Sequence, residues 1–215
     1  MQDTIKKIIL GALGLVLYHK WALLKALWLP IVLYMLLALT ALYELGKVGN
    51  LLVFLASLAI QTIFAITTHR VILLGPDSIT NWAVLHWTKR ETLFALMLIA
   101  LGLLAVPFAF LFFIPHIGPF LGILLMCWVT ARLSLVFPAI AIDREISFST
   151  SWNMTKNYQP IMFLVVIILP VMLYLPTYLL RSIPYTFVIS SLLTAFATVF
   201  VVTALSVTYK IIAKI

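Results

Sequence analysis

The stretch ALWLPIVLYMLLALTALY, residues 26–43, carries no charged side chain and is long enough to cross a bilayer. A membrane-spanning helix needs about 20 predominantly apolar residues, because the hydrocarbon core is about 30 Å thick. Five further apolar segments follow along the chain, at residues 48–68, 93–114, 117–142, 161–180 and 184–209. The sequence therefore predicts an all-α integral membrane protein with six transmembrane helices in a single membrane domain, residues 1–215.

The composition of the whole chain supports this class. Of the 215 residues, 65% are hydrophobic and 9% are charged, whereas a soluble domain is about half apolar and about a quarter charged. The single cysteine, Cys127, excludes an intramolecular disulfide and a cysteine-based zinc site. The net charge of +8 comes from cations scattered through short loops. Because they form no basic run, we expect membrane lipids and no nucleic acid as partners.

The basic residues alternate between the two sides of the predicted bundle. The termini and the two long connections, which follow the second and fourth spans, hold all the cations outside the spans except Lys47 and Arg181. Cytoplasmic loops carry an excess of Lys and Arg. We therefore expect a multi-pass protein of the bacterial inner membrane, with both termini in the cytoplasm.

The first segment, MQDTIKKIILGALGLVLYHK (residues 1–20), has a basic start and a short apolar stretch, as signal peptides do. It has no A-x-A cleavage pattern, and further lysines follow it. We expect it to be retained as an N-terminal interfacial segment along the inner surface. A short seventh span is the alternative.

Three places share a pattern in which a semi-polar segment ends in a lysine and an apolar hairpin follows. The lysines are Lys20, Lys89 and Lys156. In addition, THRVILLGP (68–76) and TARLSLVFP (130–138) both contain Thr-x-Arg with a proline six residues after the arginine. Repeated hairpins, each preceded by a cytoplasmic interfacial helix, would explain these similarities. Chance resemblance between apolar segments is the alternative.

Residues 77–89 form the clearest of these surface segments, and we predict a helix lying in the membrane plane. Its apolar face is formed, at helical spacing, by Ile79, Trp82, Ala83, His86 and Trp87. Tryptophan favours the headgroup boundary, so Trp82, Trp87 and, in the third segment, Trp152 are predicted interfacial anchors. Packing of this helix on the ends of the bundle is the alternative.

Arg132 interrupts the fourth apolar segment. A straight helix over 117–142 would place it about 15 Å from the inner end, where an arginine costs at least about 2.5–3.5 kcal/mol. No acid in the sequence lies at a matching depth. We therefore expect Arg132 at the inner headgroup level, with Asp143, Glu145 or a lipid phosphate as its partner.

Arg70 occupies the corresponding place after the second span. We predict lipid or anion contact for four cations, which are Arg70, Arg132, Lys89 and Lys156. A purely anchoring role for Arg132 is the alternative.

The other polar residues form no catalytic or metal-binding pattern. His19, His69 and His86 are expected on the cytoplasmic side and His116 outside, without the spacing of a metal site. Phosphate-binding, serine-hydrolase and zinc-protease motifs are missing, as are acids within the spans. We expect no enzyme activity, no metal and no cofactor.

Small residues indicate close helix packing. Gly118 and Gly122 form a G-x-x-x-G pair, and the sixth segment is rich in Ser, Thr and Ala. These residues serve either internal packing or the contact face of a homo-oligomer.

The stretch ARLSLVFPAIAIDREISFSTSWNMTKNY, residues 131–158, resembles the signature of the YciC-like family of small six-helix bacterial inner-membrane proteins. It is also similar to the membrane domain attached to some glycerophosphodiester phosphodiesterases. The shared positions are Arg132, Pro138, Asp143, Ser151, Lys156 and Asn157. Gly118-Pro119 departs from the Pro-Gly pair that is usual there. The resemblance implies fold and location but no activity, because the phosphodiesterase site lies in a soluble domain outside the similar region.

Three functions fit these observations. The first is a non-enzymatic role in lipid organisation or envelope homeostasis. The second is a small transporter or lipid translocator that contacts phosphate headgroups, which a polar cavity reaching mid-bilayer would favour. The third is a scaffold subunit of a membrane complex with protein partners, which an exposed face of small residues would favour.

Overall fold

The computed structural model describes residues 2–40, 43, 45–79, 85–181 and 186–214. These residues form helices and no β-strand, which confirms the predicted all-α class. Six helical segments are long and apolar enough to span a membrane, as predicted. They are α2 (Lys20–Leu39), α3 (Gly46–Leu74), α4 (Lys89–Ala109) with η3 (Phe110–Phe113), α5 (Gly118–Leu133) with α6 (Val136–Ala141), α8 (Gln159–Phe163) with η4 (Leu164–Ile168) and α9 (Leu169–Arg181), and α10 (Phe187–Ala213).

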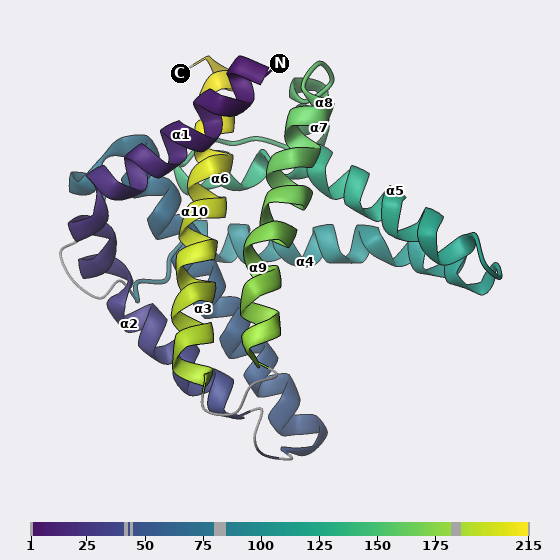
Figure 1. Ribbon diagram of the computed structural model, residues 1–215, viewed down its shortest axis with the longest axis horizontal. Helices are drawn as coiled ribbons and strands as arrows, with labels where there is room; N and C mark the ends of the chain where they lie inside the picture. Colours follow the sequence, from purple (N-terminus) through teal and green to yellow (C-terminus); the bar gives the residue numbers. More distant parts are fainter. Residues whose placement is uncertain (1, 41–42, 44, 80–84, 182–185, 215) are drawn as a thin grey trace.

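Consecutive long helices pack as hairpins, α2 with α3, α4 with α5, and α9 with α10. The C-terminal helix α10 is the centre of the bundle, because it contacts α9, α3, α1 and α2. Both termini lie at the same end of the molecule, and the α4–α5 hairpin projects sideways from the other helices (Figure 1).

Small residues on α10 make this central position possible. Ser190, Ser191, Thr203 and Ala204 are all buried, so their short side chains let neighbouring helices approach closely. In the part of the chain that the structure describes, these residues face inward and leave no exposed small-residue stripe on α10.

The N-terminal helix α1 (Gln2–Tyr18) is separate from α2 and packs on α10. It buries a stripe of Ile8, Ala12 and Val16, spaced four residues apart, while Leu10, Leu17 and Tyr18 on the other side stay exposed. The spacing is that of a helix with one packed face.

The fourth span is bent rather than straight. Proline has no backbone N–H and clashes with the preceding turn, and Pro138 follows the point where α5 ends at Leu133. The chain resumes as the short helix α6 and then turns at Asp143, whose φ of 61° is left-handed. Arg132 consequently occupies the last turn of α5 instead of the middle of a straight helix.

The predicted surface helix over 77–89 is wrong at residues 85–88. Leu85–Thr88 is not helical, and α4 begins at Lys89 because Thr88 and Glu91 form a capping box, which requires an extended backbone at Thr88. Pro76–Ser78 forms a single 3₁₀ turn. Residues 80–84, with Trp82 and Ala83, lie outside the described residues. In the third surface segment a helix does form, α7 (Phe148–Met154), capped by the Ser147 side chain.

Candidate functional site

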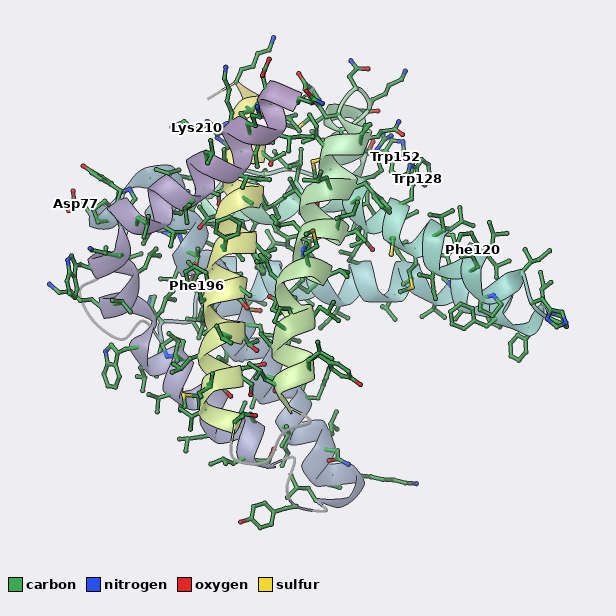
Figure 2. The ribbon with its side chains drawn as sticks, viewed as in Figure 1. Asp77, Phe120, Trp128, Trp152, Phe196 and Lys210 are labelled. Carbon is green, nitrogen blue, oxygen red and sulfur yellow. The ribbon has the colours of Figure 1, made fainter. Side chains whose placement is uncertain are left out.

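Arg132 is buried between two tryptophans at the base of the α4–α5 hairpin. Its residue is 3% exposed, and its guanidinium carbon lies 4.3 Å from the ring centre of Trp152 and 5.9 Å from that of Trp128. Nε donates to Thr155 Oγ1 at 2.8 Å, and Nη2 donates to the carbonyl oxygen of Trp152. Figure 2 shows the two tryptophans side by side where α5 meets α7. We call this group the Arg132 clamp.

The backbone of Arg132, like its side chain, is held by α7. Its carbonyl oxygen accepts a hydrogen bond from Ser151 Oγ at 2.9 Å, and Thr155 Oγ1 lies 3.1 Å away. The bend that ends α5 leaves this carbonyl without the usual partner four residues on. The hydroxyls of Ser151 in α7 and of its C-cap Thr155 therefore replace a backbone hydrogen bond and fix the corner between α5 and α7.

The predicted pairing of Arg132 with Asp143 or Glu145 is wrong. None of the ion pairs between described residues includes Arg132 or Glu145, and Asp143 binds two other arginines. The cation is stabilised by tryptophan faces and by a carbonyl in the last turn of α7, where the helix dipole favours positive charge. Whether a lipid phosphate contacts Arg132 stays a prediction.

Asp143 instead joins three elements. It accepts from Arg70 Nη1 at 2.9 Å and from Arg90 Nη1 at 3.0 Å. Arg70 also donates to the carbonyl of Ala141 at 3.0 Å and to that of Ser78 at 3.3 Å. The end of α3, the start of α4 and the end of α6 are thereby held together, and we call this group the Asp143 junction.

The structure does not gather the four predicted cations into one cluster. Arg70 belongs to the Asp143 junction and Arg132 to its own clamp. Lys89 and Lys156 are exposed, and neither forms an ion pair with a described residue. Trp87 is exposed and donates from its ring nitrogen to Thr92 Oγ1 at 2.9 Å.

An apolar groove of about 580 Å³ runs between α1, α5 and the α8–η4 segment. Its walls include Leu124, Leu125 and Trp128 of α5 and Phe163, Leu164 and Ile168 opposite them. Trp128 belongs to the Arg132 clamp as well. Gln159, another wall residue, donates to the carbonyl of Lys156 at 3.2 Å. One end of the groove is therefore next to the clamp and to an exposed lysine.

A second cavity, of about 520 Å³, lies among α2, α3, α9 and α10, with α4 and α6 closing one side. It follows α10 from Thr194 to Leu205, about 17 Å of the helix axis. Polar side chains, among them Gln61, His69 and Tyr174, interrupt its apolar wall.

The described residues contain no group of three His, Cys, Asp or Glu able to hold an ion. The three histidines predicted on the cytoplasmic side form no shared site among the described residues. His69 is buried against α10, His19 lies between α1 and α2, and His86 is exposed.

The fold defines a class, since six helices of this length and hydropathy indicate a multi-pass membrane protein. No protein-family model, curated protein or solved structure gives a significant match to the chain.

Sequence reasoning missed the polar wall of the cavity. Gln61, His69 and Tyr174 lie on different helices or different turns, so no local motif unites them. A usable signal was the presence of uncharged polar residues inside apolar spans, which favours a position facing the bundle interior.

Proposed function

We propose that the chain is a non-enzymatic, multi-pass protein of the bacterial inner membrane that binds anionic lipid and takes part in lipid organisation. The apolar groove beside the Arg132 clamp carries this proposal. A groove walled by Leu, Phe and Ile suits a lipid chain, and exposed lysines that neighbour its wall residues Ile5 and Gln159 suit a phosphate.

The charge at that end is available to a lipid. Lys156 is exposed next to Gln159, and on α1 the wall residue Ile5 is followed directly by Lys6 and Lys7, which are also exposed. A lysine close to an anionic membrane surface contributes about 1 kcal/mol of attraction. Lys156 together with one lysine of α1 would favour an anionic over a zwitterionic headgroup by about 2 kcal/mol.

The proposed orientation puts both termini, the groove's polar end and the Asp143 junction at the cytoplasmic face. Hairpin repetition is part of the proposal. It is supported by the similar contacts of Arg70 and Arg132. Each arginine donates to a backbone carbonyl in the surface segment after its own predicted span, Arg70 to that of Ser78 and Arg132 to that of Trp152.

The test uses the full chain in detergent and native mass spectrometry to count bound phosphatidylglycerol and phosphatidylcholine of identical chains. We expect preferential retention of phosphatidylglycerol, and an about fivefold loss of that preference in Lys156→Gln. Lys47→Gln is the matched control, because Lys47 is also exposed but lies at the start of α3. Equal retention of both lipids, or equal effects of the two variants, would contradict the proposal.

Lipid translocation is the second candidate, and the cavity among α2, α3, α9 and α10 favours it. Polar groups along about 17 Å of α10 provide hydrogen-bond partners within a predicted span. The scaffold hypothesis has less support, because Gly118 and Gly122 pack against α4 and η3 of their own hairpin. Formation of a homo-oligomer stays a prediction.

A further inference from the structure

The cavity among α2, α3, α9 and α10 is separate from the lipid groove, and the two share no wall residue. Its volume of about 520 Å³ lies within the range of about 300–1,000 Å³ that is typical of small-molecule pockets. Most of the wall is apolar, with Ile60, Phe64, Phe94 and Leu98 among its members. A molecule that fills it must therefore be largely apolar.

The described wall contains no Lys, Arg, Asp or Glu. A charged headgroup placed there would lose its hydration without gaining an opposite charge, which is costly. Uncharged polar groups remain, and these can satisfy a neutral headgroup through hydrogen bonds. The wall thus selects for an uncharged ligand.

His69 is the most informative polar group in this wall. The residue is 1% exposed, and its Nδ1 lies 2.7 Å from Ser206 Oγ on α10. Ser206 Oγ donates its only proton to the carbonyl of Val202 at 2.9 Å. With the serine proton on that carbonyl, the serine oxygen accepts from His69 and the imidazole proton lies on Nδ1.

This assignment leaves Nε2 of the neutral ring as an acceptor. Among the described residues Nε2 has no hydrogen-bond partner, and it is not one of the fully enclosed unpaired atoms, which are the hydroxyls of Thr62, Thr203 and Tyr209. Because the ring lines the cavity, Nε2 is available to a donor group inside it.

The hydroxyls of Thr198 and Tyr174 in the wall also use their protons in hydrogen bonds within the protein. Thr198 Oγ1 donates to the carbonyl of Thr194 at 2.8 Å and lies 2.9 Å from the hydroxyl of Tyr174. With the Thr198 proton on that carbonyl, Tyr174 donates to Thr198, which leaves lone pairs on both oxygens. Gln61 can donate, but it lies about two helical turns from His69 on α3. The region around His69 presents acceptors to its ligand.

We propose that this cavity binds an uncharged, single-chain amphiphile whose hydroxyl group donates a hydrogen bond to His69 Nε2. Long-chain alcohols and monoacylglycerols share this chemistry. An amphiphile whose headgroup has no hydroxyl, such as a methyl ester, an ether or a ketone, offers only acceptors and leaves Nε2 unpaired.

The experiment places the full chain in nanodiscs and measures displacement of tritiated 1-dodecanol, with empty nanodiscs as the background. We expect unlabelled 1-dodecanol to compete at least about tenfold better than dodecyl methyl ether, which has the same chain and no donor. Laurate, which is charged, should also compete at least about tenfold less well than the alcohol.

Four variants locate the binding site and the group that recognises the hydroxyl. His69→Phe keeps a planar ring and removes the acceptor, so alcohol binding should fall to the level of the ether while ether binding is unchanged. Ser206→Ala removes the group that fixes the imidazole proton on Nδ1 and should reduce the preference for the alcohol. Ala65→Phe fills the cavity and should lower binding of both compounds, whereas Ala109→Phe, on an exposed face of α4, should not.

Three results would overturn the proposal. One is an ether that competes as well as the alcohol for the unaltered chain, a comparison that needs no variant to fold. Another is a preference for the alcohol that survives in His69→Phe. The third is alcohol binding that Ala65→Phe leaves intact. Loss of phosphatidylglycerol retention is a separate result, because it tests the groove.

Discussion

Ser151 donates its hydroxyl proton to the carbonyl oxygen of Arg132 at 2.9 Å, while the side chain of Arg132 reaches the carbonyl of Trp152. The end of α5 and the helix α7 therefore hold each other through side chains from both partners. Arg132, Asp143 and Ser151 all act in such corner contacts. Their roles in the structure are positional.

Replacement of Arg132 by lysine should destabilise the protein by about 1–3 kcal/mol. A single ammonium group cannot reach Thr155 and the Trp152 carbonyl in the same geometry as the guanidinium, and it stacks less well on tryptophan. Thermal unfolding in detergent measures the effect. Arg144→Lys is the control, because Arg144 is exposed and has no ion pair with a described residue. Similar unfolding temperatures for the two variants would count against the clamp.

Arg132→Leu tests whether Arg132 stabilises the protein through a buried ion pair or through its uncharged partners. No carboxylate among the described residues is left unpaired by this change, so we expect a folded protein. Its loss should be of the same order as that of Arg132→Lys. A chain that fails to fold would indicate a buried ion pair, where removal of one partner costs about 3–5 kcal/mol.

Asp143→Asn should loosen the junction of α3, α4 and α6. The variant loses the charge shared by Arg70 and Arg90, but the Asp143 side chain is 59% exposed. Solvent screening therefore limits the expected loss to about 1 kcal/mol. High salt should reduce the difference from the unaltered chain in thermal unfolding. Glu145→Gln, at an exposed position without an ion pair to a described residue, should have no effect.

Gly122→Ala should open the α4–α5 hairpin. An added Cβ would lie 2.7 Å from Phe112 Cε1 and 2.8 Å from the carbonyl oxygen of Phe108. Such overpacking costs about 1–3 kcal/mol. Gly102→Ala provides the comparison, because nothing lies within 4 Å of its Cβ position and alanine favours helix. If both variants unfold at the same temperature, the close approach does not contribute to stability.

The proposed orientation has a direct test in reporter fusions. Fusions after Gly46 and Ile117 should report a location outside the cytoplasm, and a fusion after Thr150 a cytoplasmic one, because of the distribution of Lys and Arg. A reversed signal at any of these three positions would require a different topology.

Hydropathy predicted the number and place of the long apolar helices because each is a continuous apolar run, which is local information. The contacts of Arg132 were not predictable in the same way. They depend on how far Pro138 bends the chain and on which side α7 packs, and both are decided by tertiary contacts. The cavity around His69 has the same origin, since Ser206 is 137 residues away in sequence. Gly118 and Gly122 did indicate close packing, but the sequence left open whether the partner was the same chain.

The sideways hairpin has a mechanical consequence. The fully buried residues of α4 are Glu91, Phe94 and Ala95, all near its start, and α5 packs on α7, α8 and η4, so the far half of α4 projects beyond the other helices. A helix of 21 residues is about 31 Å long. A rotation of about 10° at the Asp143 junction would therefore move the far end of α4 by about 5 Å. The contacts of Arg70 and Arg90 with Asp143 thus lie where a small rotation of the hairpin has a large effect at its tip.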